Sequence, residues 1–280
     1  MRIFPLRTLV PLWNFELRQK SSLTLEKHLV IRRLFKYERD HLEKTFLGVQ
    51  ALLFPRFVIV YSLPQHLPRH VQGKTLYPRY EYTTKVIEAL RLFRTGDVGN
   101  NFFAHVFEKS LTTFAEWPSH FDSSNVGNSY ILDRRGMKDF VPFWPRYKRW
   151  KPHDIQRHVD RFMGAYMRRN WLDRLVDLVT CMEGILLPDG GPELSYRFSL
   201  RLAWLLGSGR REQEELFTQA RDIYNLRSQV VHGRARTENT SRIEISRRAE
   251  GFSRRLILKA MENPSQFSVN TLRNIGFGAG

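Results

Sequence analysis

The stretch "YNLRSQVVHG", residues 224–233, is typical of the end of an amphipathic helix, with Gly233 as the stop signal after His232. With about 100° of rotation per residue, six apolar or aromatic side chains lie within about 60° of Arg227: Leu216, Ala220, Ile223, Tyr224, Val230 and Val231. The pattern therefore predicts a permanent cation at the centre of an apolar stripe. An unpaired buried charge costs several kcal/mol, so Arg227 requires a partner or an opening to solvent.

A second segment, residues 171–187, carries a charge of the opposite sign on its own apolar face. Five of its apolar residues cluster within about 60° of Val179 on a helical wheel: Leu172, Leu175, Val176, Met182 and Leu186. Glu183 lies among them, at about 40°. Two interpretations follow. Either Glu183 and Arg227 form a buried ion pair that only fixes the helix register, or Arg227 faces an opening that receives an anion.

Beside the apolar stripe, a polar stripe runs along the same helix and contains Arg221, Asn225, Ser228 and His232. His232 lies in the last turn, where the helix dipole favours a protonated imidazole. Histidine suits proton transfer near neutral pH, and arginine stays charged and forks onto phosphate oxygens. The two side chains together favour a phosphodiester-cleaving pair. The simpler alternative is a histidine that serves as a surface or capping residue.

Outward from this helix, apolar periodicity predicts a helical domain over residues 151–280. The expected helices are 154–168 continuing into 171–187, then 194–207, 211–232 and 241–264, with the turn "PDGGPE" at 188–193. Short turns imply antiparallel neighbours, hence an all-α four-helix up-and-down bundle. The proline-punctuated, basic stretch "PRYKRWKPH" (145–153) marks the expected domain boundary.

Residues 1–150 predict a mixed α/β domain, which makes the whole chain α+β. "LLFPRFVIVYSL" (52–63) is typical of a strand, and "TTKVIEALRLFRTGDVG" (83–99) of a helix that stops at Gly96. The segments 28–35 and 45–54 fit either a helix or a strand. Residues 100–144 show no clear period.

The chain carries a formal net charge of +17, unevenly distributed. Residues 1–150 hold 24 Lys and Arg against 13 Asp and Glu, and residues 197–280 hold 15 against 8, whereas residues 151–196 are close to neutral. A pI near 10.3 makes a polyanionic partner such as RNA plausible. A solvated basic surface without a partner is the alternative.

Other classes of protein fit the sequence poorly. No apolar run approaches the about 20 residues that span a bilayer, and the N-terminus is a poor signal peptide, so we expect a soluble, cytoplasmic protein without membrane contact. Cys181 is the single cysteine, which excludes an intrachain disulfide and a cysteine-cluster zinc site. A glycine-rich phosphate loop, HExxH and paired metal-ligand spacing are absent, so we expect no cofactor and no metal ion.

The segments "MEGILLPDGGPELSYRFSLRLAWLLG" and "IYNLRSQVVHG", between Met182 and Gly233, resemble the Apea-like branch of the HEPN domains (higher eukaryotes and prokaryotes nucleotide-binding). The resemblance covers about residues 165–262. It implies a metal-independent endoribonuclease whose site forms where two helical bundles meet in a homodimer.

The resemblance also implies roles for individual residues. His232 would act as general base or acid on the RNA 2′-OH and the leaving oxygen, and Arg227 would hold the scissile phosphate. Ser228 would bind the phosphate or position His232, and the products would be a 2′,3′-cyclic phosphate and a 5′-hydroxyl. The helical wheels add supporting residues, Glu183 and Asn225, and cations expected to contact RNA, Arg197, Arg201 and Arg221.

Members of this group resemble toxins or antiphage defence effectors, and we expect residues 1–150 to sense a trigger or restrain the nuclease. Two other functions stay open. One is a non-catalytic nucleic-acid-binding protein that uses the basic N-terminal half and the arginines of "SRRAEGFSRRL" (246–256). The other is a HEPN-like scaffold with negligible RNA affinity.

Overall fold

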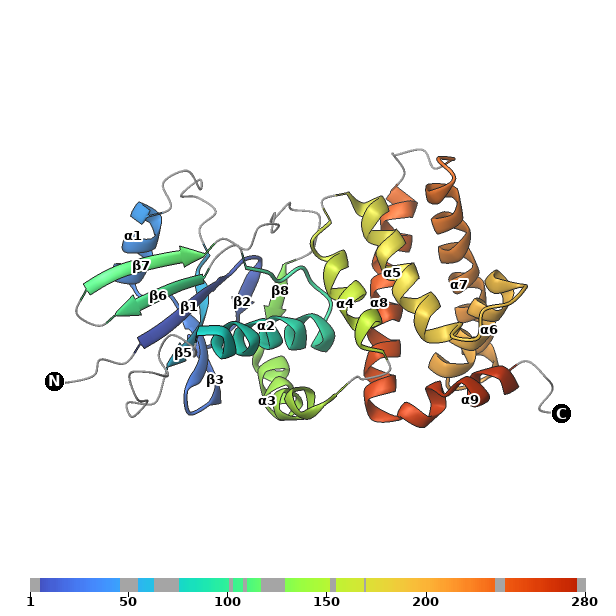
Figure 1. The fold of residues 1–280 in the computed structure, drawn as a ribbon, viewed down its shortest axis with the longest axis horizontal. Coiled ribbons are helices and arrows are strands. Elements are labelled where there is room, and N and C mark those ends of the chain that lie inside the picture. The colour runs from blue at the N-terminus through green and yellow to red at the C-terminus, as the bar shows by residue number, and fades with distance from the viewer. Residues whose placement is uncertain are drawn as a thin grey trace. The chain divides into compact units, whose positions relative to one another are not determined.

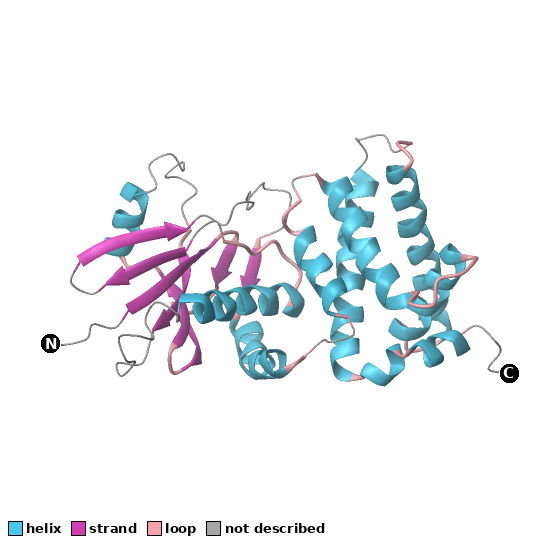
Figure 2. Ribbon diagram, viewed as in Figure 1, coloured by secondary structure: helices cyan, strands magenta, loops and turns pink. Residues whose placement is uncertain are grey.

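The computed structural model describes residues 6–45, 55–62, 76–100, 103–107, 110–116, 129–151, 155–168, 170–234 and 240–275. The chain divides into two compact units, Met1–Arg149 and Trp150–Gly280, one residue from the boundary expected from the sequence. All described strands belong to the first unit, and the second consists of helices and turns (Figure 2). The α+β class is therefore confirmed.

The first unit contains a six-stranded antiparallel sheet of order β3-β4-β5-β1-β6-β7. Its strands are β1 (Leu6–Leu12), β3 (Ser22–Glu26), β4 (Leu29–Arg33), β5 (Phe57–Ser62), β6 (Phe103–Phe107) and β7 (Ser110–Glu116). The strand expected within 52–63 is confirmed as β5, and the ambiguous segment 28–35 contains β4. Most of the other ambiguous segment, 45–54, lies outside the described residues.

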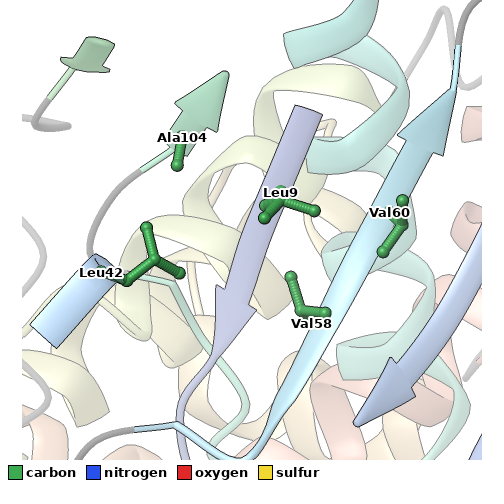
Figure 3. Packing of buried hydrophobic residues seen from close by; sticks show 5 residues of the cluster. All are labelled: Leu9, Leu42, Val58, Val60 and Ala104. Atoms are coloured by element: carbon green, nitrogen blue, oxygen red, sulfur yellow. The ribbon is translucent and has the colours of Figure 1, made fainter. Parts of the chain in front are cut away.

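Helices cover both faces of this sheet. On one face, Leu9, Val58, Val60 and Ala104 form a buried cluster with Leu42 of α1 (Lys36–Thr45), as Figure 3 shows. Neighbouring residues of a strand point to opposite faces, so Tyr61 of β5 points away from that cluster. Its ring lies 5.6 Å from the ring of Tyr82 in α2 (Leu76–Phe93). The helices α1 and α2 therefore lie on opposite faces.

The helix α2 confirms the prediction for 83–99, because it ends at Phe93 and Gly96 follows with φ of +139°. Two further strands, β2 (Phe15–Leu17) and β8 (Tyr130–Leu132), form a separate parallel pair. After β8 the chain enters α3 (Arg134–Arg149).

The boundary predicted within 145–153 is confirmed, since the two units divide between Arg149 and Trp150. The proline at position 145 does not itself end a helix, because Pro142 and Pro145 both lie inside α3. The reason is tertiary packing: Phe140, Trp144 and Tyr147 are buried on one side of α3, and the two prolines lie on its exposed side. There water can replace the backbone hydrogen bonds that a proline removes.

The second unit is built from α4 (Gln156–Ala165), α5 (Trp171–Leu186), α6 (Leu194–Leu206), α7 (Arg210–Val231), α8 (Thr240–Glu262), the short 3₁₀ helix η3 (Pro264–Phe267) and α9 (Val269–Asn274). The expectation that 154–168 and 171–187 form one helix is wrong. The side chain of Asn170 accepts a hydrogen bond from the Leu172 amide at 2.9 Å and starts a new helix, α5, which packs beside α4.

The helix α5 is the centre of this unit, since it contacts α4, α7 and α8, while α6 and α7 pack side by side (Figure 1). Nine residues of α5 are buried, among them Cys181, whose thiol pKa burial raises. The helices α4 and α5 together replace the first expected helix, and α6, α7 and α8 match the other three, while α9 is additional. Among the described helices, none has both the length and the apolarity needed to cross a membrane.

Candidate active site

The C-terminal end of α7 has the geometry that the sequence predicts. The His232 amide donates to the Ser228 carbonyl at 3.1 Å and the Gly233 amide to the Val230 carbonyl at 3.0 Å. Gly233 has φ of +67°, a left-handed conformation that closes the helix and that a glycine adopts without strain. His232 is exposed directly before this stop.

The apolar face of α7 is shorter than the wheel suggests. Its buried residues are Leu216, Ala220, Ile223 and Leu226. Val231, in contrast, is 53% exposed, since the last turn extends beyond this buried region. Arg227 therefore stays near the centre of the stripe around the helix, within about 40° of Leu216, Ala220 and Ile223. Along the helix, however, it lies at the C-terminal end of the buried region, just after Leu226.

Arg227 is held by Glu183 of α5. Its Nη2 lies 3.2 Å from Oε2 of Glu183, and the two side chains are 26% and 20% exposed. The Nε of Arg227 is buried and has no hydrogen-bond partner among the residues that the structure describes. The guanidinium is thus anchored by one carboxylate but is not sealed from solvent, and part of its hydrogen-bonding capacity is unused.

Tyr224 completes this group, although the sequence analysis placed it only in the apolar stripe. Its hydroxyl donates a hydrogen bond to Glu183, and its ring lies 5.2 Å from that of Phe198. Burial and the adjacent Glu183 carboxylate raise the pKa of the Tyr224 hydroxyl, while the Arg227 charge lowers it. Residues three apart share a helix face, so its spacing from Arg227 could have indicated the contact.

Arg227, Glu183 and Tyr224 are thus brought together, whereas His232 is displaced from them along α7. It lies five positions after Arg227, which corresponds to about 7.5 Å along the axis and about 140° around it. Arg221 and Asn225 are exposed and Ser228 is half-buried. The polar stripe therefore lies at the surface.

The two other arginines expected to contact RNA have a different role. The Arg201 guanidinium binds Asp189 in a bidentate manner, at 2.8 Å to Oδ1 and 3.1 Å to Oδ2, and donates to the Leu186 carbonyl at 2.8 Å. Its side chain is 3% exposed. Arg197 also binds Asp189 and donates to the Gly190 carbonyl.

Hydrogen bonding from Arg201 lowers the pKa of Asp189 to about 2, against the smaller effect of burial. Asp189 lies in the turn between α5 and α6, so the two arginines hold that turn in place. This finding corrects the expectation that Arg197 and Arg201 line a cleft for RNA.

A similar correction applies to the stretch "SRRAEGFSRRL" of α8. Arg254 is buried and its Nη2 lies 2.5 Å from Oε1 of Glu250, whose other oxygen accepts from Arg174 at 2.9 Å. Arg255 donates to the Leu206 carbonyl at 2.8 Å. Half of the arginines in this stretch therefore stabilise helix packing.

A histidine that the sequence analysis did not single out contacts α5 next to Glu183. The imidazole of His158 in α4 lies over Gly184, where an added Cβ would stand 2.0 Å from its Cε1. Burial and the neighbouring Arg157 lower the pKa of His158. The contact explains why a glycine follows Glu183, since a side chain there would displace the His158 imidazole.

In the described part of the chain, no three His, Cys, Asp or Glu side chains are grouped as ligands for a metal ion. Comparison with protein-family models finds no match, and searches of the curated proteins and of the solved structures find none either.

Proposed function

We propose that the second unit is a metal-independent endoribonuclease of the HEPN type, acting as a homodimer on RNA. The observation that carries this proposal is the state of Arg227. It is oriented by Glu183 through one contact of 3.2 Å, and its side chain is 26% exposed and so is not sealed from solvent. A guanidinium that is fixed but not saturated suits an oxyanion that arrives with the substrate.

In this mechanism the nucleophile belongs to the RNA. His232 removes the proton of a ribose 2′-OH, and the 2′-oxygen attacks the adjacent phosphorus. The 5′-oxygen leaves and takes a proton from the protonated His232, which yields a 2′,3′-cyclic phosphate and a 5′-hydroxyl. Arg227 binds the phosphate and stabilises the charge that develops on its oxygens, while Glu183 and Tyr224 hold the guanidinium in place.

The position of His232 supports a composite site. About 140° of helix rotation separates it from Arg227, so one helix presents the two side chains on different faces. Two copies of α7 that meet near their C-terminal ends would place both residue types around one phosphate. A role as a toxin or antiphage effector restrained by residues 1–150 also belongs to this proposal.

The test is cleavage of a mixed RNA pool in EDTA by the wild type, His232→Ala and Arg227→Ala. We expect cyclic phosphate ends from the wild type and a loss of at least about 100-fold in each variant, the scale of removing one oxyanion donor. Arg210→Ala is the matched control, because Arg210 lies on the same helix with its side chain 93% exposed. Cleavage that persists in both site variants would refute the assignment.

The second candidate is a HEPN-like protein that binds RNA or a partner without cleaving. The Glu183–Arg227 contact favours it insofar as an ion pair between α5 and α7 also fixes helix register. A salt titration of RNA binding distinguishes an RNA-binding protein from a scaffold. Phosphate contacts make the affinity fall steeply with salt, whereas a scaffold has no RNA affinity to lose.

A further inference from the structure

The junction between β4 and α1 in the first unit exposes two aromatic rings side by side. Phe35 is 49% exposed and Tyr37 is 53% exposed. Their centroids lie 5.9 Å apart with an interplanar angle of 21°, which is a stacked arrangement. Large exposed aromatic side chains that adjoin one another indicate a contact surface rather than chance exposure.

Contacts with Arg32, Glu38 and the sheet core fix the segment that carries the two rings. Arg32 binds Glu38 through two hydrogen bonds, at 2.7 and 2.6 Å, and its guanidinium carbon lies 4.0 Å above the centre of the Phe35 ring. The Phe35 amide donates to Glu38 at 3.0 Å. Leu34 packs against the sheet core. Because these contacts fix the segment, binding would cost little conformational entropy.

Cations are frequent in the segment that carries the aromatic pair. Residues 32–39 carry four cations against one carboxylate, and that carboxylate, Glu38, is buried and already bound to Arg32. Lys36, between the two aromatic residues in sequence, is exposed, whereas the Arg33 guanidinium lies 5.6 Å from the centre of the Phe57 ring. Arg39 is also exposed but pairs with Glu43 at 2.6 Å. The surface thus combines apolar ring faces with positive charge, in the more basic half of the chain.

We infer that this surface, the Phe35–Tyr37 platform, binds single-stranded RNA. Unpaired bases stack on aromatic rings whatever their sequence, and the adjacent cations neutralise the phosphates that connect them. Bases in a duplex are already stacked on one another and cannot extend the platform. The inference concerns the first unit and holds whether or not the second unit cleaves RNA.

The test measures the Kd of the full-length chain for a fluorescent 12-nucleotide RNA in which every ribose is 2′-O-methylated. This probe cannot be cut by 2′-OH attack, so binding is measured even if the ribonuclease proposal is right and also if it is wrong. We expect Phe35→Ala/Tyr37→Ala to weaken binding by at least about 5-fold, the lower limit for one lost stacking contact. Phe35→Tyr/Tyr37→Phe keeps both rings and should keep the wild-type Kd.

Tyr196→Ala/Trp204→Ala is the matched control, since these α6 side chains are 54% and 46% exposed and should leave the Kd unchanged. Lys36→Ser should lower the slope of log Kd against log salt by about 0.7, the value for one phosphate contact on a single strand. This second measurement leaves both rings intact and tests the platform even if the double alanine variant fails to fold.

An unchanged Kd in Phe35→Ala/Tyr37→Ala, or an equal loss for a duplex of the same sequence, would overturn the inference. The inference would also be overturned if Phe35→Ala/Tyr37→Ala kept its RNA affinity but no longer co-sedimented with vesicles containing phosphatidylserine. In that case the platform would bind a membrane surface. If the platform variants lose RNA affinity while the wild type cleaves nothing in EDTA, the platform stands and the nuclease proposal fails.

Discussion

Two arginine sites in the helical unit look alike in sequence and differ in structure. In one, Arg201 and Arg197 surround Asp189 in the turn between α5 and α6; in the other, Arg227 meets Glu183 between α7 and α5. The Arg201 side chain is 3% exposed and makes three hydrogen bonds, whereas Arg227 is 26% exposed and makes one of 3.2 Å.

The difference separates an arginine used for folding from an arginine available to a ligand. Both oxygens of Asp189 are bound by Arg201, and Arg197 binds the same carboxylate, so the pKa of Asp189 is low. Glu183 instead divides its hydrogen bonds between one arginine and the neutral hydroxyl of Tyr224. Glu183 therefore orients the Arg227 guanidinium through a single hydrogen bond. The phosphate-binding role proposed for Arg227 requires such a cation, because its other donors are not occupied by Glu183.

The largest expected effect concerns stability. Arg201→Ala removes one side of a buried, bidentate pair, so the free energy of unfolding should fall by about 3 kcal/mol. Arg227→Ala removes a partly exposed contact and should cost less than about 1 kcal/mol. Urea denaturation of both variants measures the difference. If the wild type has the proposed ribonuclease activity, Arg201→Ala should retain it at urea concentrations below the unfolding midpoint of the variant. A loss of cleavage there would mean that the two sites are not distinct.

A smaller effect follows from pH. The folded state holds the pKa of Asp189 at about 2, below its ordinary value of 3.8. The ionised carboxylate therefore stabilises the fold above about pH 4, and this contribution is lost as the pH falls towards about 2. We expect the difference in unfolding free energy between the wild type and Asp189→Asn to narrow over that range in acid titrations. A difference that stays constant would show that Arg201 binds Asp189 without regard to its charge.

The sequence predicts what depends on local pattern. The β-branched run of β5 and the glycine stops after α2 and α7 are in place, because strand packing and helix termination are encoded within a few residues. Apolar periodicity does not predict the break between α4 and α5, because it continues across the break, which only the Asn170 cap and the packing of α4 on α5 define.

Side-chain roles were harder to predict, because a helical wheel shows which face a residue occupies and not what it meets. The wheels place Glu183 and Arg227 on the apolar faces of their helices and so predict the possible ion pair between them, which the structure contains. The spacing of basic residues in the segment 194–207 indicates Arg197 and Arg201 as cleft-lining cations, because their partner, Asp189, lies in a turn to which no periodicity applies. The tyrosine at position 224 counted as apolar because the wheel considers its ring and not its hydroxyl.

The smallest expected effect tests that hydroxyl. Tyr224→Phe keeps the ring on Phe198 but removes the donor to Glu183, so the unfolding free energy should fall by no more than about 1 kcal/mol. If Tyr224 positions Arg227 through Glu183, kcat for RNA cleavage should fall several-fold with little change in KM.

The matched control is Tyr196→Phe, because Tyr196 of α6 is 54% exposed and contacts Phe217 through its ring, at 5.7 Å. A merely structural Tyr224 would give the stability loss without the kcat loss. In the positioning role, Glu183→Gln and Tyr224→Phe should be non-additive in kcat, because both act through the same guanidinium. Additive losses would mean that Tyr224 does not act through Arg227. The difference between Arg227 and Arg201 would then depend on Glu183 alone.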